Sequence, residues 1–147
     1  MPGEYDGLLL SNQLCFPLYA CSKEIVRRYK PMLDELDLTY TQYITMMVMW
    51  EEETVNVKEL GERLFLDSGT LTPLLKKLET KGYISRERSE EDERNLIVRI
   101  TRKGMALRDW AKSVPVKMAS CVSLSADDAA TLKRILDSML RQFSAGE

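Results

Sequence analysis

The chain has 147 residues, of which 44% are hydrophobic and 30% are charged, as expected for one globular domain with a buried core. Its net charge of −2 argues against a general binder of polyanions. It has no histidine and only three scattered cysteines, which argues against a zinc site, histidine-based catalysis and a disulfide framework. We therefore expect no metal and no cofactor.

The first residues, 1–6, are acidic and lack the basic segment that opens a signal peptide. The longest nearly apolar run, 43–50, is far shorter than the roughly 20 residues that span a bilayer. We expect a cytoplasmic protein with no membrane partner.

An apolar segment at residues 8–29 is predicted to be helical, and Pro31 is expected to open a short second helix. Pro17 lies inside the first segment, where a proline costs a continuous helix about 3 kcal/mol. The helix therefore kinks at Pro17 or begins late. Thr39 and Gln42 form a capping-box pattern before a methionine-rich helix, whose methionines we interpret as core rather than as a ligand pocket.

The central segment, 66–82, carries leucines at the spacing of a helix with one buried face. Its opposite face combines short hydroxyl side chains with two lysines and suits a DNA groove. We favour Thr70 over Ser68 as the N-cap, which would leave Pro73 in the first turn, with Gly82 after the end.

The flanking segments predict a winged helix-turn-helix at 56–101. Upstream, Asn56 is expected to cap a short amphipathic helix, and the connection 66–69 has the length that such a motif uses. Downstream, 83–88 and 95–100 have strand character and are joined by a polar tip. Residues 56–104 hold 11 Lys and Arg against 9 Asp and Glu, so the positive balance lies in the predicted DNA-binding unit.

After the wing, Thr101 is expected to cap a helix that is interrupted at Pro115, and residues 125–128 cap a last helix with an apolar stripe. The helical regions 8–38 and 102–143 would then form a dimer, or else cover the core of their own subunit. The predicted fold is a single domain, 1–147, mainly α with a small β-hairpin wing.

The chain resembles the MarR family of bacterial regulators in residues 66–74, in the Asp92-Glu93-Arg94 wing tip and in 96–104. Residues 12–16, together with Tyr19, Tyr29 and Tyr40, are similar to the organic hydroperoxide sensors of the OhrR type. The resemblance implies a dimeric repressor, not an enzyme. Its recognition helix would read operator DNA in the major groove, Arg94 would reach the minor groove, and oxidation of Cys15 by an organic hydroperoxide would release the DNA.

The candidate DNA contacts lie on the recognition helix and the wing. They are Ser68, Gly69, Thr70, Thr72, Lys76, Lys77, Arg86, Asp92 and Arg94. The two threonines are expected to meet bases and the two lysines phosphates. Asp92 is expected to hold the wing by pairing with Arg86 or Arg88.

Peroxide is attacked by a thiolate, so a sensing Cys15 needs access and groups that stabilise its charge. Tyr19 would share its helical face, whereas Tyr29 would lie about 21 Å away along a continuous helix. The family resemblance implies that Tyr29 and Tyr40 come from the partner subunit. Cys121 resembles the resolving cysteine of the two-cysteine class, which joins opposite subunits.

Several alternatives remain open at this point. Cys15 is a buried inert thiol in one of them, and in another a small cellular thiol caps it while Cys121 is a bystander. A repressor of the same fold could answer to a small phenolic ligand, and a thiol peroxidase would use a reactive cysteine without needing the wing.

Overall fold

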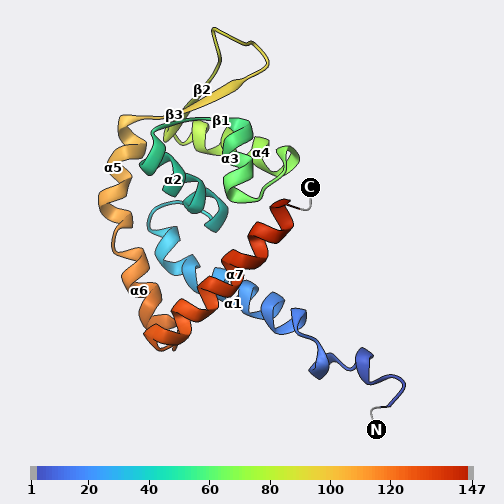
Figure 1. Cartoon of the computed structure of the whole chain (residues 1–147). Coiled ribbons are helices and arrows are strands. Elements are labelled where there is room, and N and C mark those ends of the chain that lie inside the picture. The colour runs from blue at the N-terminus through green and yellow to red at the C-terminus, as the bar shows by residue number, and fades with distance from the viewer. Residues whose placement is uncertain (1–2, 146–147) are drawn as a thin grey trace.

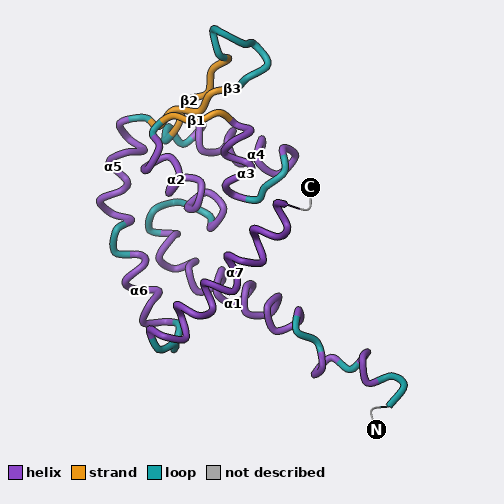
Figure 2. The backbone as a smooth tube through the Cα atoms, in the orientation of Figure 1, coloured by secondary structure: helices purple, strands orange, loops and turns teal. Residues whose placement is uncertain are grey.

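The computed structural model describes residues 3–145, so the first two and last two residues of the predicted domain lie outside it. Helices dominate, and the wing belongs to a small three-stranded sheet (Figures 1 and 2). The elements are η1 (Asp6–Leu8), η2 (Leu10–Asn12), α1 (Cys15–Asp34), α2 (Tyr40–Glu52), β1 (Thr54–Asn56), α3 (Val57–Leu64), α4 (Ser68–Thr80), β2 (Ile84–Arg88), β3 (Leu96–Ile100), α5 (Arg102–Ala111), α6 (Val114–Cys121) and α7 (Ala126–Ala145).

An N-terminal arm precedes the first long helix and extends away from the rest of the subunit (Figure 1). It contains the two short 3-10 turns in place of the helix expected from residue 8. The side-chain amide of Gln13 donates to the main-chain oxygens of Gly7 and Leu9, both at 2.8 Å. These two bonds hold the arm in a compact, non-α-helical form just before α1.

Helix α1 begins at Cys15 and continues unbroken to Asp34. Pro17 is its third residue, where the missing amide donor would have had no helical partner, so the late start predicted as one alternative is confirmed. The separate helix expected at Pro31 is not formed. Pro31 lies in the last turn of α1, and burial of Leu33 just beyond it holds that turn against the core.

The capping box before α2 is confirmed. The amide of Gln42 donates to the Thr39 hydroxyl at 3.2 Å, and the amide of Thr39 donates to Gln42 Oε1 at 3.1 Å. Met46 and Met49 are fully buried core residues, as we interpreted them, whereas Met47 lies on the outer face of α2 and is 44% exposed, so it is not a core residue of the subunit. Helix α2 is thereby packed in the centre of the subunit.

Helix α4 begins three residues earlier than predicted, because its N-cap is Asp67 rather than Thr70. The Asp67 carboxylate accepts the Thr70 amide at 2.7 Å, and hydrogen bonds from Thr70 hold the pKa of this carboxyl below its usual value. Pro73 consequently lies in the second turn, where α4 loses one hydrogen bond. Buried Leu71, Leu74, Leu75 and Leu78 keep the helix in place.

The wing is a hairpin of β2 and β3, as predicted, with Ile84 opposite Ile100 and Arg88 opposite Leu96. Strand β1 was not predicted. It pairs antiparallel with the other edge of β3, giving the order β1-β3-β2. Three residues are too short to show strand alternation in a sequence, and only their pairing with β3 makes them a strand.

The C-terminal helices follow the predicted caps. The Thr101 hydroxyl accepts the Gly104 amide at 3.0 Å, Pro115 lies in the first turn of α6, and the Ser125 hydroxyl accepts the Asp128 amide at 3.1 Å. Helices α5 and α6 descend along one side, and α7 crosses back toward α3 (Figure 1).

The core extends from the end of α1 across α2, α3, α4 and the sheet to α5 and α6. Helices α3 and α4 with the β2–β3 hairpin form the winged helix-turn-helix predicted at 56–101. By contrast, much of the apolar stripe of α7 is exposed: Leu132, Ile135, Leu140 and Phe143. Between residues 3 and 145, no helix combines the length and the apolar character needed to cross a bilayer.

Candidate functional site

Cys15 is exposed at the first position of α1. The preceding residue, Leu14, provides no side-chain cap, so the first amide donors of α1 are not occupied by a capping side chain. The dipole of the helix favours negative charge at this end. Tyr19 lies one turn further along, and Lys23 Nζ lies 5.2 Å from the centre of its ring. Cys15 is therefore an accessible thiol at the N-terminal end of a long helix.

Tyr29 and Tyr40 pack together between α1 and α2. Their ring centres are 5.0 Å apart, and Tyr43 completes a tyrosine cluster at 5.8 Å from Tyr29 and 6.3 Å from Tyr40. Sequence reasoning missed Tyr43. The sequence did hold an indication of this role, because Tyr43 follows Tyr40 by three residues and the two therefore lie on the same face of α2.

Burial keeps the phenols of the cluster protonated. It raises the pKa of Tyr29, with a smaller contribution from Tyr40, and it raises the pKa of Tyr40. Burial, followed by repulsion from the other two tyrosines, raises the pKa of Tyr43 to about 12. At neutral pH all three are hydroxyl donors, able to hydrogen-bond an anion such as a thiolate.

The raised pKa of Tyr43 predicts an alkaline loss of stability. Above pH 10 the unfolded chain ionises its tyrosines while Tyr43 in the fold stays protonated, so stability that is complete below pH 10 falls as the pH rises toward 12. In wild type, the free energy of unfolding measured with urea should fall between pH 10 and pH 12, and in Tyr43→Phe this fall should be smaller by about 2 to 3 kcal/mol. Tyr5→Phe, at an exposed tyrosine, is the control; equal pH profiles for the Tyr43 variant and wild type would contradict the prediction.

The tyrosine cluster is remote from Cys15 within one subunit. Because α1 is unbroken, Tyr29 lies about 21 Å along the helix from Cys15. Cys121 is remote as well: its main-chain oxygen accepts a hydrogen bond from Arg28 Nη1 at 2.9 Å, and Arg28 is about 20 Å along α1 from Cys15. A site that unites these groups needs a second subunit.

The exposed face of α4 carries Thr70, Thr72, Lys76 and Lys77, opposite the buried leucines. Ser68 and Gly69 are exposed at the N-terminal end of the helix. These six residues form a continuous surface of short polar groups followed by two cations. Such a surface can approach base edges closely and meet phosphates further along.

The wing tip presents Arg94, whose side chain is 90% exposed. Asp92 pairs with Arg94 and not with Arg86 or Arg88, which corrects the expected partner. The Asp92 carboxylate accepts Arg94 Nε at 3.1 Å and the Arg94 amide at 3.0 Å, and these bonds lower the pKa of Asp92. The two residues lie in the same tight turn, so their contact is local.

Arg86 is directed inward, although it was expected to contact DNA. Its side chain is only 17% exposed and donates to Glu79 Oε1 at 3.1 Å, while its amide donates to Glu79 Oε2 at 3.0 Å. The bonds lower the pKa of Glu79. Arg86 thus joins the wing to α4, and its Nε finds no hydrogen-bond partner within the described chain. Sequence reasoning missed Glu79, whose role depends on how β2 packs against α4.

Comparisons with known proteins agree with this fold. A family model described as transcriptional regulator SarA/Rot matches residues 27–109. The organic hydroperoxide resistance transcriptional regulator of Bacillus subtilis is 46% identical over 140 residues, 95% of each chain. The HTH-type transcriptional regulator SarZ of Staphylococcus aureus is 50% identical over 127 residues, 86% of each chain. The chain belongs to the MarR family of winged-helix regulators.

Solved structures of AbfR resemble this regulator over nearly its whole length. Reduced AbfR bound to DNA superposes with a TM-score of 0.81 at 29% identity, covering 97% of this regulator and 98% of AbfR. AbfR with a disulfide formed superposes with a TM-score of 0.66 at 31% identity, covering 95% and 96%.

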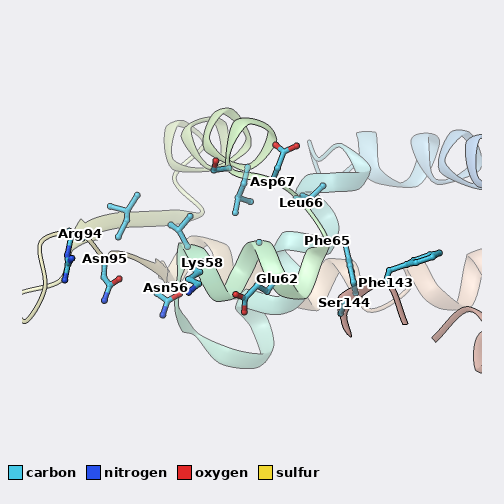
Figure 3. Close-up of a pocket in the computed structure, with 15 residues that line it drawn as sticks. Asn56, Lys58, Glu62, Phe65, Leu66, Asp67, Arg94, Asn95, Phe143 and Ser144 are labelled. Atoms are coloured by element: carbon cyan, nitrogen blue, oxygen red, sulfur yellow. The ribbon is translucent and has the colours of Figure 1, made fainter. Parts of the chain in front are cut away.

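A hollow of about 940 Å³ lies between the wing, the turn before α4 and the end of α7 (Figure 3). Arg94 lines the hollow at the wing, Lys58 lines it from α3, and Phe65 and Phe143 line its other end. Phe65 has a left-handed φ of 55° and is more than half exposed. The end of α7 and the turn of the regulator's helix-turn-helix thus line the same hollow.

Proposed function

We propose that this regulator is a repressor that binds operator DNA as a homodimer and releases it when an organic hydroperoxide oxidises Cys15. The observation that carries the proposal is the separation of about 21 Å between Cys15 and Tyr29 along an unbroken α1. A second subunit is needed to bring neutral phenols to the thiolate. The exposed apolar stripe of α7 and the N-terminal arm offer surfaces for that subunit.

The sensing chemistry uses the Cys15 thiolate as nucleophile. Its sulfur attacks the terminal, hydrogen-bearing oxygen of the hydroperoxide, so an S–O bond forms and the O–O bond breaks. Cys15 becomes a sulfenic acid, and the hydroperoxide is reduced to an alkoxide that takes a proton and leaves as an alcohol. Hydrogen bonds from Tyr29 and Tyr40 of the partner subunit would position the thiolate before attack. The name of the Bacillus subtilis relative supports this class of oxidant.

On DNA, α4 is the recognition helix, and the solved complex of reduced AbfR supports this arrangement. The hydroxyls of Thr70 and Thr72 would meet base edges, with Lys76 and Lys77 on phosphates. Ser68 and Gly69 would bring the start of α4 close to the backbone, and Asp92 would hold Arg94 toward the minor groove. The relatives are named as transcriptional regulators, and we infer regulation in the cytoplasm without enzymatic turnover.

A gel shift on DNA from upstream of the protein's own gene tests the function. Reduced wild type should bind, and cumene hydroperoxide should release it, whereas Cys15→Ser should bind and stay bound because it cannot form the sulfenic acid. Cys21→Ser, at another exposed cysteine of α1, is the matched control and should respond like wild type. Release of Cys15→Ser by a small phenol, or steady peroxide turnover without DNA binding, would each contradict the proposal.

A further inference from the structure

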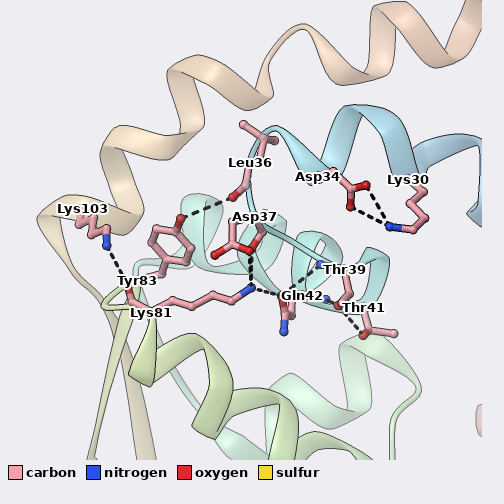
Figure 4. Close-up of polar contacts among 10 residues, drawn as sticks. All are labelled: Lys30, Asp34, Leu36, Asp37, Thr39, Thr41, Gln42, Lys81, Tyr83 and Lys103. Carbon is pink, nitrogen blue, oxygen red and sulfur yellow. Dashed lines mark hydrogen bonds and ion pairs between the residues drawn. The ribbon is translucent and has the colours of Figure 1, made fainter.

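Lys81 ends the recognition helix and reaches the turn between α1 and α2 (Figure 4). Its ammonium donates to the main-chain oxygen of Asp37 and to Gln42 Oε1, the latter at 3.0 Å, and lies 3.5 Å from the Asp37 carboxylate. An ammonium has three donors, and all of these acceptors belong to the turn or to the start of α2. The side chain is 25% exposed, so the contacts are largely shielded from water.

Tyr83, two residues further on, makes a second connection to the same turn. Its hydroxyl donates to the main-chain oxygen of Leu36 at 3.4 Å in a buried setting. Lys103 Nζ donates to the Lys81 oxygen at 2.8 Å and lies 5.2 Å from the centre of the Tyr83 ring. The segment after α4 is thus bonded to two successive carbonyls, those of residues 36 and 37.

The turn lies between the helices that carry the tyrosine cluster. Tyr29 is on α1, five residues before the helix ends at Asp34, and Tyr40 is the first residue of α2 after the turn. Gln42 Oε1 accepts both Lys81 and the Thr39 amide, so one atom serves the cap of α2 and the connection to α4. Asp37 has a φ of 54°, which is uncommon for a residue with a side chain and leaves the turn dependent on its neighbours.

We propose that Lys81, assisted by Tyr83, is a positioning residue that transmits the state of the tyrosine cluster to the recognition helix. The inference rests on the proposed function. A displacement of Tyr29 or Tyr40 moves the turn at 36–37, and the bonds from Lys81 and Tyr83 carry that movement to the C-terminal end of α4. Because α4 is a continuous helix of 13 residues, movement of its C-terminal end also moves the face that is proposed to contact DNA.

The first test compares the operator affinity of oxidised and reduced protein by fluorescence anisotropy, using DNA from upstream of the protein's own gene. The ratio of the two dissociation constants should fall by about 2- to 30-fold in Lys81→Met, which removes the ammonium and keeps an apolar stem. It should fall less in Tyr83→Phe, which deletes one oxygen atom. A purely structural role would change thermal stability and leave this ratio intact.

Lys30→Met is the matched control. Lys30 pairs with Asp34 at 2.9 Å on the same end of α1, yet this pair is exposed and has no bond to α4. In Lys30→Met, the ratio of the dissociation constants of oxidised and reduced protein should equal that of wild type. An unchanged ratio in both Lys81→Met and Tyr83→Phe would overturn the inference.

A second test requires no oxidant, because coupling between two sites is reciprocal. Binding of the same DNA should slow amide hydrogen exchange at 36–43 in wild type and much less so in Lys81→Met. Equal protection from exchange in wild type and Lys81→Met, or protection in neither although both bind DNA, would overturn this inference and leave the proposed function standing. Protection in wild type without any release by hydroperoxide would retain the coupling and contradict the proposed function. Failure to bind DNA would overturn both.

Discussion

Treatment of the reduced protein with an organic hydroperoxide should produce a covalent dimer on non-reducing electrophoresis, joined between Cys15 and Cys121 of the partner subunit. The thiol of Cys121 attacks the sulfenic sulfur of Cys15, the S–S bond forms and water leaves. Within one subunit the two residues are too far apart, because Cys121 bonds to Arg28 and a disulfide needs Cα atoms within about 7 Å.

The three cysteines provide the controls for this prediction. Cys15→Ser and Cys121→Ser should each abolish the covalent dimer. Cys21→Ser should retain it, because Cys21 lies about 9 Å along an unbroken helix from Cys15 and faces another direction. A single monomer band in oxidised wild type would contradict the prediction and favour capping of Cys15 by a small cellular thiol.

The second large effect concerns DNA. Removing the ammonium groups of Lys76 and Lys77 should weaken operator binding and lower the slope of log affinity against log salt by about one unit each, because each phosphate contact releases a counterion. Arg94→Ala should also weaken binding through loss of the wing contact. Changes at Thr70 and Thr72 should instead alter the preferred bases.

Titrations from low to high salt on operator and on unrelated DNA measure these effects. Lys112→Ala, at an exposed lysine beyond the end of α5, is the matched control and should keep the wild-type slope. The assignment of the DNA-facing surface is wrong if affinity proves insensitive to salt and to all five substitutions.

Local features were predictable because they depend on residues near in sequence. The leucine spacing of α4 predicted its buried face, and Asn56, Thr39 and Thr101 cap their helices as expected. Even so, local competition between similar groups was misjudged. Asp67 outcompeted Thr70 for the cap of α4 because a carboxylate is the stronger acceptor. The first third of the expected N-terminal helix, residues 8–14, lies in the arm instead of α1.

The sequence by itself determined the winged helix-turn-helix and the exposed face of α4, since periodicity needs no knowledge of distant neighbours. The structure decided that α1 runs unbroken from Cys15 past Tyr29, which sets their separation at about 21 Å. Only the tertiary structure decided that Tyr43 joins Tyr29 and Tyr40, that Glu79 holds Arg86 and that Lys81 bonds to Asp37, 44 residues away. Each of these contacts depends on how one element packs against another, and that packing depends on the burial of the whole core.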